Sequence, residues 1–289
     1  MHDFQILFDH GERSELLDPI YAPYGKLGFP NPPSDRPWVY ANFVQTLDGI
    51  TSLLGRDASG ADIAQSIEDR WLMDLLRAHA DGVLLGLGTL MLEKNLGRPR
   101  ARGPVFRIVE PTLQQLRTKL RRDVERNIFV TGSGRLNLSD FAVFDGDRAE
   151  AAIITSPEGS EKLKGHSSSH PHVKIIVSGQ GSSVDLVEAL RELRTSMGIR
   201  YLLCEGGPQL YGAMLRERLI DEKFVTVSPL DAGQVIPKEQ EPVAWPQSAL
   251  RPTIFSGEGF TKENMVRWNW VSCRKVGDYQ FNRYRRVIS

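Results

Sequence analysis

Short β-prone runs alternate with helix-like segments along most of this chain, and this alternation constrains the fold more than any other feature. The predicted strands are 38–44, 82–85, 127–131, 151–155, 173–177 and 201–204. Between them apolar residues recur at helical spacing, as in Ile67, Trp71, Leu72, Leu75 and Leu76. Strands that alternate with helices predict a mainly parallel sheet covered on both faces, and therefore an α/β fold.

The two ends of the chain depart from this pattern. Prolines and scattered aromatic residues in 1–36 predict an irregular arm on the surface of one domain, residues 37–289. Near the other end, 266–272 and 279–286 predict two strands joined at Gly277-Asp278, an antiparallel hairpin at the sheet edge. Residues 229–265 contain five prolines and little periodicity. They are too long for an ordinary connection and predict a lid or an interface segment.

Two local patterns carry further predictions. Thr112 and Gln115 have the spacing of a capping box, and the apolar residues after them predict a helix that continues to Val124. Residues 165–171 contain three serines and two histidines and predict a flexible surface connection. The nearby histidines, His166, His170 and His172, could bind a metal. No carboxylate or cysteine supports them, so a solvated loop is the preferred interpretation and no metal site is predicted.

Charge and cysteine content narrow the class of protein. Lys plus Arg and Asp plus Glu both count 36, which gives zero formal net charge and makes nucleic acid an unexpected partner. Cys204 and Cys273 lie in apolar runs and predict buried thiols without a disulfide. The first residues lack the basic start of a secretory signal, and the apolar stretch 83–92 is too short to span a bilayer. A cytoplasmic protein that does not bind membranes is expected.

Two glycine-bearing junctions suggest a ligand. Gly206-Gly207 follow the predicted strand 201–204 and precede a helix that begins at Pro208. The first turn of a helix has unpaired N–H groups that can hold a phosphate, and glycine lets a ligand approach the backbone. The segment Gly86-Leu87-Gly88-Thr89 follows another strand. Each junction alone could be only a tight turn, but two together favour a dinucleotide, whose diphosphate needs two such donors.

Three separate segments resemble one known family. Residues 38–49, 75–89 and 205–222 resemble, in order and spacing, the pyrimidine reductase of riboflavin biosynthesis, and the similarity extends from about residue 37 to the C-terminus. That reductase is often the C-terminal half of a bifunctional deaminase-reductase, and its fold is similar to that of dihydrofolate reductase. The resemblance implies NADPH-dependent hydride transfer to a phosphoribosylaminouracil and a homodimer. The His-x-Glu and Pro-Cys-x-x-Cys motifs of the zinc deaminase half are absent.

The resemblance implies a set of cofactor-binding residues around the glycine junctions and the strand ends. They are Val44, Thr46, Gly86, Thr89, Glu93, Ser133, Arg135, Gly206, Gly207, Pro208, Gln209, Leu210 and Tyr211. The hydroxyl and guanidinium groups of Ser133 and Arg135 would suit a 2′-phosphate, which favours NADPH over NADH. A capped polar turn at that position is an equally open alternative.

The resemblance also implies a substrate site and candidate catalytic carboxylates. The substrate-binding residues are Asn42, Asp62, Arg77, Glu205 and either Arg98 or Arg100, and the candidate catalytic residues are Glu205 and Asp48. Alternatives remain open: Arg77 could form a salt bridge with Asp74 or Asp81, Glu205 could cap the following helix, and Asp48 could shape the turn before Gly49.

The chain departs from the family pattern at several positions. Asn42 stands where the family often has lysine, and Glu93 where aspartate is common. A proline-rich loop replaces the glycine-rich segment that normally follows the strand of Phe224. A reductase of the same fold with another substrate, such as a dihydropterin, therefore stays open, as does a nucleotide-binding protein without catalysis.

Overall fold

The computed structural model describes residues 2–13, 18–53, 60–95, 107–122, 124–146, 149–167, 169–234 and 251–288. The strands are β1 (Gln5–Asp9), β2 (Trp38–Gln45), β3 (Gly82–Gly86), β4 (Arg126–Thr131), β5 (Glu150–Thr155), β6 (Lys174–Val177), β7 (Tyr201–Cys204), β8 (Glu222–Val227), β9 (Trp268–Val276) and β10 (Tyr279–Arg286). The α-helices are α1 (Ala61–Ala64), α2 (Ile67–His79), α3 (Leu87–Asn95), α4 (Pro111–Lys119), α5 (Pro157–Ser167), α6 (Leu186–Ser196) and α7 (Pro208–Arg216). Short 3₁₀ helices span Pro19–Tyr21, Leu138–Asp140 and Ala142–Phe144.

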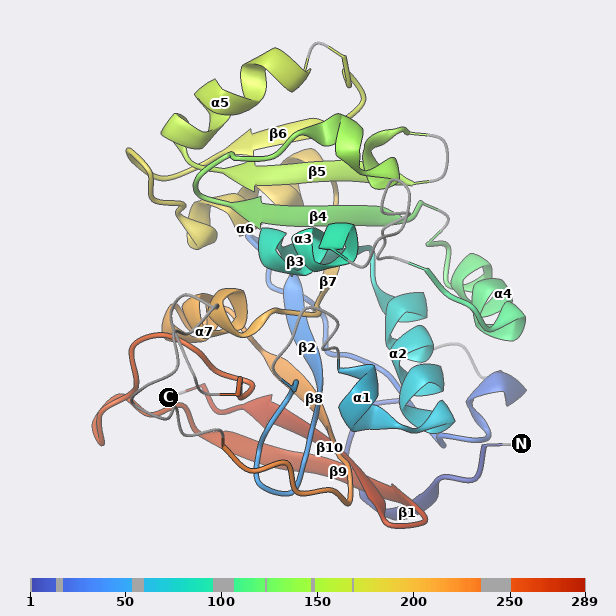
Figure 1. The fold of residues 1–289 in the computed structure, drawn as a ribbon. Coiled ribbons are helices and arrows are strands. Elements are labelled where there is room, and N and C mark those ends of the chain that lie inside the picture. The colour runs from blue at the N-terminus through green and yellow to red at the C-terminus, as the bar shows by residue number, and fades with distance from the viewer. Residues whose placement is uncertain are drawn as a thin grey trace.

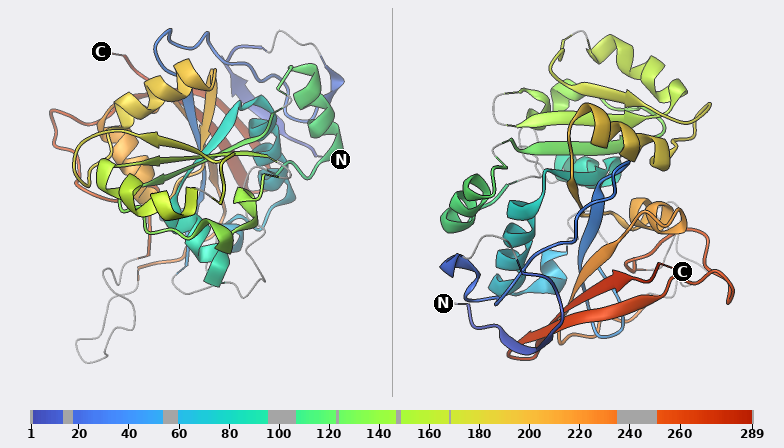
Figure 2. Two further views of the ribbon diagram at one scale, coloured as in Figure 1. Left: turned by 90° about the horizontal axis from the view of Figure 1, so that it is seen from above. Right: turned by 180° about the vertical axis from the view of Figure 1, so that it is seen from behind.

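All described strands belong to one sheet, in the order β1-β9-β10-β8-β2-β7-β3-β4-β5-β6 (Figure 1). The strands from β8 to β6 in this order are parallel, so their carboxyl ends meet along one edge. The three strands β10, β9 and β1 are antiparallel and extend the other end of the sheet. The sheet twists so strongly that β4 to β6 run across the direction of β2 and β8 (Figure 2).

Helices cover both faces of this sheet. The helices α2, α3, α4 and α5 contribute buried residues on one face, for example Leu75, Leu90, Leu113 and Leu163. The helices α6 and α7 cover the other face. The alternation of strands and helices therefore predicts the fold class correctly, including the mainly parallel sheet and the antiparallel C-terminal hairpin. None of the helices that the structure describes is long and apolar enough to cross a membrane.

Four local predictions are corrected by the structure. Residues 157–167 form α5, so the first three residues of the predicted flexible connection 165–171 belong to a helix. The helix α4 ends at Lys119 and is capped by Glu110, whose side chain accepts from the backbone of Thr112. Ile67 begins α2 but is 72% exposed, because the first turn extends beyond the core. The hairpin strand β9 starts at Trp268 and continues to Val276, four residues past the predicted end at 272.

The N-terminal arm is not wholly irregular, because Gln5–Asp9 form β1 and pair with β9. Tyr21, Tyr24 and Leu27 of the arm are buried in the core below α2. The Arg274 guanidinium stacks 3.7 Å from the centre of the Tyr24 ring and donates to the Tyr24 carbonyl at 2.5 Å. The arm is therefore an integral part of the packed structure.

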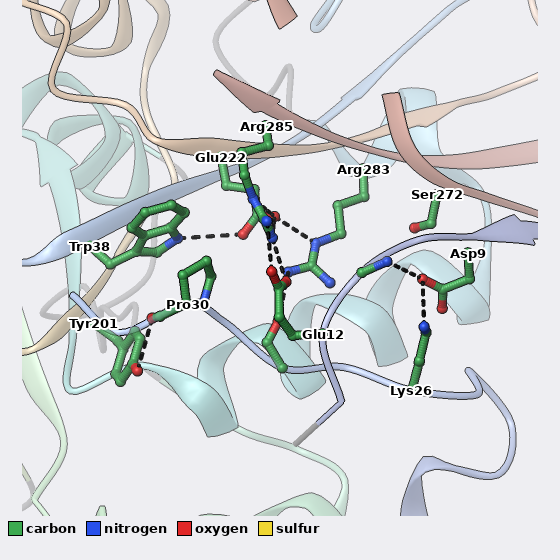
Figure 3. Close-up of polar contacts among 12 residues, drawn as sticks. Asp9, Glu12, Lys26, Pro30, Trp38, Tyr201, Glu222, Ser272, Arg283 and Arg285 are labelled. Carbon is green, nitrogen blue, oxygen red and sulfur yellow. Dashed lines mark hydrogen bonds and ion pairs between the residues drawn. The ribbon is translucent and has the colours of Figure 1, made fainter. Parts of the chain in front are cut away.

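Buried ion pairs fix the arm to the C-terminal strands (Figure 3). The Arg283 Nε donates to Glu222 Oε1 at 2.8 Å, and both side chains are at most 1% exposed. A second guanidinium nitrogen of Arg283 donates to the Gly28 carbonyl at 2.6 Å. Arg274 pairs with Asp9 at 2.5 Å, and Arg285 bridges Glu222 and Glu12. Since buried charges need partners, these contacts tie both chain ends together.

His79 joins the arm to α2 and gives a prediction about acid stability. Burial lowers the pKa of His79 from 6.5 to about 3, and the Tyr21 hydroxyl hydrogen-bonds its Nε2 at 2.9 Å. The unfolded chain binds a proton at this side chain below about pH 6.5 while the folded chain does not, so stability falls as the pH falls. Between about pH 7 and pH 5 the free energy of unfolding should drop by about 2 kcal/mol from this group alone.

Urea unfolding of the wild type and of His79→Gln at both pH values measures this contribution. The glutamine variant should be less stable at neutral pH but should lose about 2 kcal/mol less than the wild type on acidification. Equal losses in the two proteins would show that His79 does not carry the acid sensitivity.

Candidate functional site

A cavity of about 1180 Å³ opens at the carboxyl ends of the parallel strands. Its walls come from the starts of α3 and α7, the end of β4, the approach to α6, and the segment that precedes β9. Among the described residues, the lining comprises Gly86, Leu87, Gly88, Thr89, Val130, Thr131, Gly132, Ser133, Ser182, Ser183, Val184, Leu186, Gly207, Pro208, Gln209, Leu210, Ala213, Gln234, Arg251, Pro252, Thr253, Phe255, Ser256 and Gly257. Most of these residues offer backbone groups, hydroxyls or small side chains.

The two glycine junctions lie side by side in this cavity. The Gly86 N–H donates to the Gly206 carbonyl at 2.8 Å, and the Glu205 N–H donates to the Leu84 carbonyl at 3.1 Å. The peptide bond between Gly206 and Gly207 is cis. A side chain at Gly207 would first meet Thr89 Oγ1, 3.9 Å from an ideal Cβ. The protein therefore leaves the space above Gly207 open for a ligand.

The start of α7 carries donors that the helix itself does not use. Gly207 is the N-cap residue, Pro208 begins the helix, and no described side chain caps it. The first intrahelical bond runs from the Tyr211 N–H to the Gly207 carbonyl at 3.0 Å. The N–H groups of Gln209 and Leu210 precede that bond, so they suit an anion.

The end of β4 forms a polar turn at the cavity. Thr131 Oγ1 accepts from the Gly134 N–H at 3.2 Å, and Ser133 Oγ accepts from the Arg135 N–H at 3.3 Å. Ser133 is exposed and lines the cavity, whereas Arg135 is exposed and does not line it. The capped polar turn that was left open as an alternative is therefore present, and Ser133 in this turn also lines the cavity.

Arg77 and Glu205 form a buried, two-pronged ion pair. Arg77 Nε and Nη2 donate to the two Glu205 carboxylate oxygens, each at 2.7 Å, and the side chains are 8% and 10% exposed. The remaining Nη1 donates to the Arg107 carbonyl at 2.9 Å. Burial alone would lower the pKa of Arg77, but the Glu205 charge outweighs it and raises the pKa. Two other salt bridges were expected for Arg77. The one with Asp74 is long, at 3.9 Å from Arg77 Nη1 to Asp74 Oδ1, and Asp81 pairs with Arg122 instead.

Asp48 stabilises the turn after β2. Its carboxylate accepts from the N–H groups of Ala232 at 3.1 Å and Gly233 at 2.6 Å, and from the Thr46 hydroxyl. The hydrogen bond from Thr46 lowers the pKa of Asp48. Thr46 is buried and also accepts from the Ile50 N–H at 2.9 Å. Both side chains serve the turn and lie outside the cavity lining.

The other predicted residues lie at different distances from the cavity. Asn42 and Val44 point to the α2 face of β2, where Asn42 Oδ1 is buried without a partner among the described residues. Asp62 is exposed on α1. Tyr211 is buried with its ring 4.8 Å from that of Phe43. Gly206 adjoins Gly86 without lining the cavity. Glu93 belongs to α3, but its side chain lies outside the described part, and Arg98 and Arg100 lie outside the described residues.

The segment 251–257 belongs to the loop 229–265, for which the sequence predicts a lid or an interface segment and of which residues 235–250 lie outside the described residues. The segment 251–257 forms one cavity wall, held by hydrogen bonds from Thr51 N–H to the Pro252 carbonyl at 2.9 Å and from Ser256 N–H to the Pro208 carbonyl at 3.2 Å. Burial raises the pKa of Asp69 in the first turn of α2, and the Thr226 hydroxyl partly offsets this. The exact place of the segment 251–257 and the environment of Asp69 could not be predicted, because both depend on contacts distant in sequence.

Comparisons with known proteins agree on one family. A family model described as the RibD C-terminal domain matches residues 37–279. A 2,5-diamino-6-ribosylamino-4(3H)-pyrimidinone 5′-phosphate reductase of Archaeoglobus fulgidus is 26% identical over 233 residues, which cover 79% of this chain and 90% of that protein.

Two solved structures have the same fold. A pyrimidine reductase-like protein of Corynebacterium diphtheriae has a TM-score of 0.65 and 19% identity, and covers 88% of this chain and 94% of its own. The riboflavin biosynthesis reductase of Saccharomyces cerevisiae has a TM-score of 0.55 and 15% identity, over 93% and 100% of the two chains.

Proposed function

Because this chain belongs to the RibD C-terminal domain family of riboflavin-pathway pyrimidine reductases, we propose that it uses NADPH to reduce a phosphoribosylaminouracil. The observation that carries the proposal is the cavity in which the two glycine junctions adjoin, next to the buried pair of Arg77 and Glu205. An oxidoreductase needs a donor site and an acceptor site that touch, and the position of Glu205, which does not line the cavity but directly precedes Gly206, supports the proposal of an acceptor site beside the cavity.

The cavity fits a dinucleotide. Gly207 leaves its backbone accessible, and the start of α7 presents N–H groups that suit a diphosphate. Thr89, Ser133 and the backbone of Gly86 would complete the cradle. NADPH supplies the hydride when it is bound. Arg135 stays a proposed contact for the 2′-phosphate, and this contact is the reason for preferring NADPH.

On the substrate side, we assign Glu205 to the heterocycle or its ribose and Arg77 to the positioning of Glu205. The guanidinium is fully engaged by Glu205 and by the Arg107 carbonyl, so it fixes the carboxylate rather than reaching for a phosphate. Asn42 and Glu205 follow Ala41 and Cys204, which pair between β2 and β7, and the side-chain carbonyl oxygen of Asn42 has no partner among the described residues. Asp48 stabilises the turn after β2, whereas Glu205 directly precedes the Gly206-Gly207 junction, so of the two candidate carboxylates we propose Glu205 as the catalytic one.

Consumption of NADPH with defined substrates tests the function. The purified protein receives the phosphoribosylaminouracil, the diaminopyrimidinone phosphate named for the Archaeoglobus relative, dihydrofolate, or no substrate. Rapid oxidation with the aminouracil supports the proposal. Oxidation only with the diaminopyrimidinone phosphate would show that the substrate carries one more amino group than the proposed aminouracil. Oxidation only with dihydrofolate would show that the protein is a pterin reductase. Tight NADPH binding without any oxidation would leave a nucleotide-binding protein.

We propose that the protein forms a homodimer. Its location in the cytoplasm stays a prediction. On the antiparallel strands the Trp270 ring contacts those of Phe8 and Tyr284, and Trp270 is 49% exposed. Exposed aromatic residues in contact suit a protein interface. Light scattering should give twice the 32.4 kDa chain mass, and Trp270→Glu should return it to a monomer. A wild-type monomer would contradict the assembly.

A further inference from the structure

The described lining of the cavity contains a single charged residue, Arg251. No lysine, aspartate or glutamate of the described chain shares that lining, whose other polar groups are hydroxyls, amides and backbone N–H or C=O groups. A cavity with one cation and no carboxylate favours an anion.

No described carboxylate neutralises Arg251. Its Nη1 donates to the backbone carbonyls of Ala232 and Gly233, the latter at 3.2 Å, and its Nε is buried without a partner in the described structure. The Gln234 side chain holds the Arg251 backbone at both ends, accepting from its N–H at 2.8 Å and donating to its carbonyl at 3.1 Å. The Arg251 guanidinium is therefore held in place, but no described carboxylate balances its positive charge.

The segment that carries Arg251 is fixed on one side to residues that follow β2 and on the other side to α7. Ile50 and Thr253 form an antiparallel bridge, and the Thr51 hydroxyl donates to the Pro252 carbonyl at 3.1 Å. On the other side, the Ser256 carbonyl lies so close to Gly212 that a Cβ there would be 2.2 Å from it. This packing holds the segment against α7, whose first turn also lines the cavity.

We propose that Arg251 and the first turn of α7 form an anion subsite that binds the diphosphate of the dinucleotide. The proposal rests on the proposed function and adds a residue to its cofactor site. A planar guanidinium matches the paired oxygens of a phosphate, and helix N–H groups complement it. Ser133 lies on a different wall, at the end of β4, so the 2′-phosphate and the diphosphate have separate partners.

Calorimetry with three ligands tests the assignment in Arg251→Gln. Affinity for NADPH and for ADP-ribose, which both contain the diphosphate, should fall about tenfold, while affinity for adenosine 2′-monophosphate, which carries the 2′-phosphate but no 5′-phosphate, should stay unchanged. Arg251→Lys keeps the charge but not the fork and should lose less. Arg216→Gln is the matched control, because Arg216 lies on α7, contacts the Glu258 carbonyl at 3.4 Å and does not line the cavity.

Several results would overturn the inference. Unchanged ADP-ribose affinity in a folded Arg251→Gln would remove the subsite, and a loss for NADPH and adenosine 2′-monophosphate but not for ADP-ribose would assign Arg251 to the 2′-phosphate instead. An equal loss in Arg216→Gln would point to a general disturbance of α7. The proposed function fails separately: a wild type that binds ADP-ribose through Arg251 but oxidises no NADPH would keep the subsite and refute the reductase.

Discussion

Gly207→Val is expected to weaken NADPH binding by about 100-fold or more while the protein still folds. The valine side chain would occupy the space above the backbone at the start of α7, where the cofactor's phosphates are proposed to bind. Within the protein an ideal Cβ at this position meets only Thr89 Oγ1, at 3.9 Å, and φ is −72°, which L-residues adopt. Fluorescence titration with NADPH measures the loss.

The matched control is Gly165→Val in α5, where an added Cβ meets nothing within 4 Å and no ligand is proposed. It should bind NADPH like the wild type. Gly207→Ala should show an intermediate loss, since its side chain is smaller. A folded Gly207→Val with wild-type affinity would remove the start of α7 from the cofactor site.

Glu205→Leu and Arg77→Met are each expected to lower the free energy of unfolding by about 3–5 kcal/mol. Each leaves the other charge buried without its partner, since both side chains are at most 10% exposed. The double variant should recover much of this stability, because two apolar side chains replace the pair. Turnover should remain lost in Glu205→Leu and in the double variant, since both lack the carboxylate. Urea unfolding and NADPH oxidation provide the two measurements.

The kinetics of Arg77→Lys separate positioning from direct binding. If Arg77 positions Glu205, lysine should lower kcat and leave the Michaelis constant for NADPH nearly unchanged, because the single ammonium cannot hold both carboxylate oxygens. A double variant that turns over substrate at the wild-type rate would show that the pair is only structural.

The parts of this fold that follow from local pattern could be predicted. Short β-prone runs such as 201–204 and an amphipathic helix such as α2 depend on near neighbours, and both match the structure closely. The glycine junctions could also be located, because a strand followed by glycine and Pro208 has one plausible local geometry. Helix ends could be predicted less accurately, since Glu110 rather than Thr112 caps α4.

Pairings distant in sequence could not be predicted. The partner of Arg77 lies 128 positions away, so the nearer Asp74 and Asp81 were the natural expectations. Arg251 reaches the cavity only because Ile50 and Pro208 anchor its segment from two directions. The strand β1 was missed for a similar reason, since its hydrogen bonds go to β9 near the other end of the chain.

The ion pairs between the N-terminal arm and the strands β9 and β10 determine when the arm can dock during synthesis of the chain. Asp9 and Glu12 leave the ribosome 265 and 273 residues before their partners Arg274 and Arg285. The strand β1 must therefore wait, undocked, until β9 and β10 have been translated. Contacts between such distant positions form late and slow the search for the native state. A chain cut short before β9 would expose the surface that the arm normally covers.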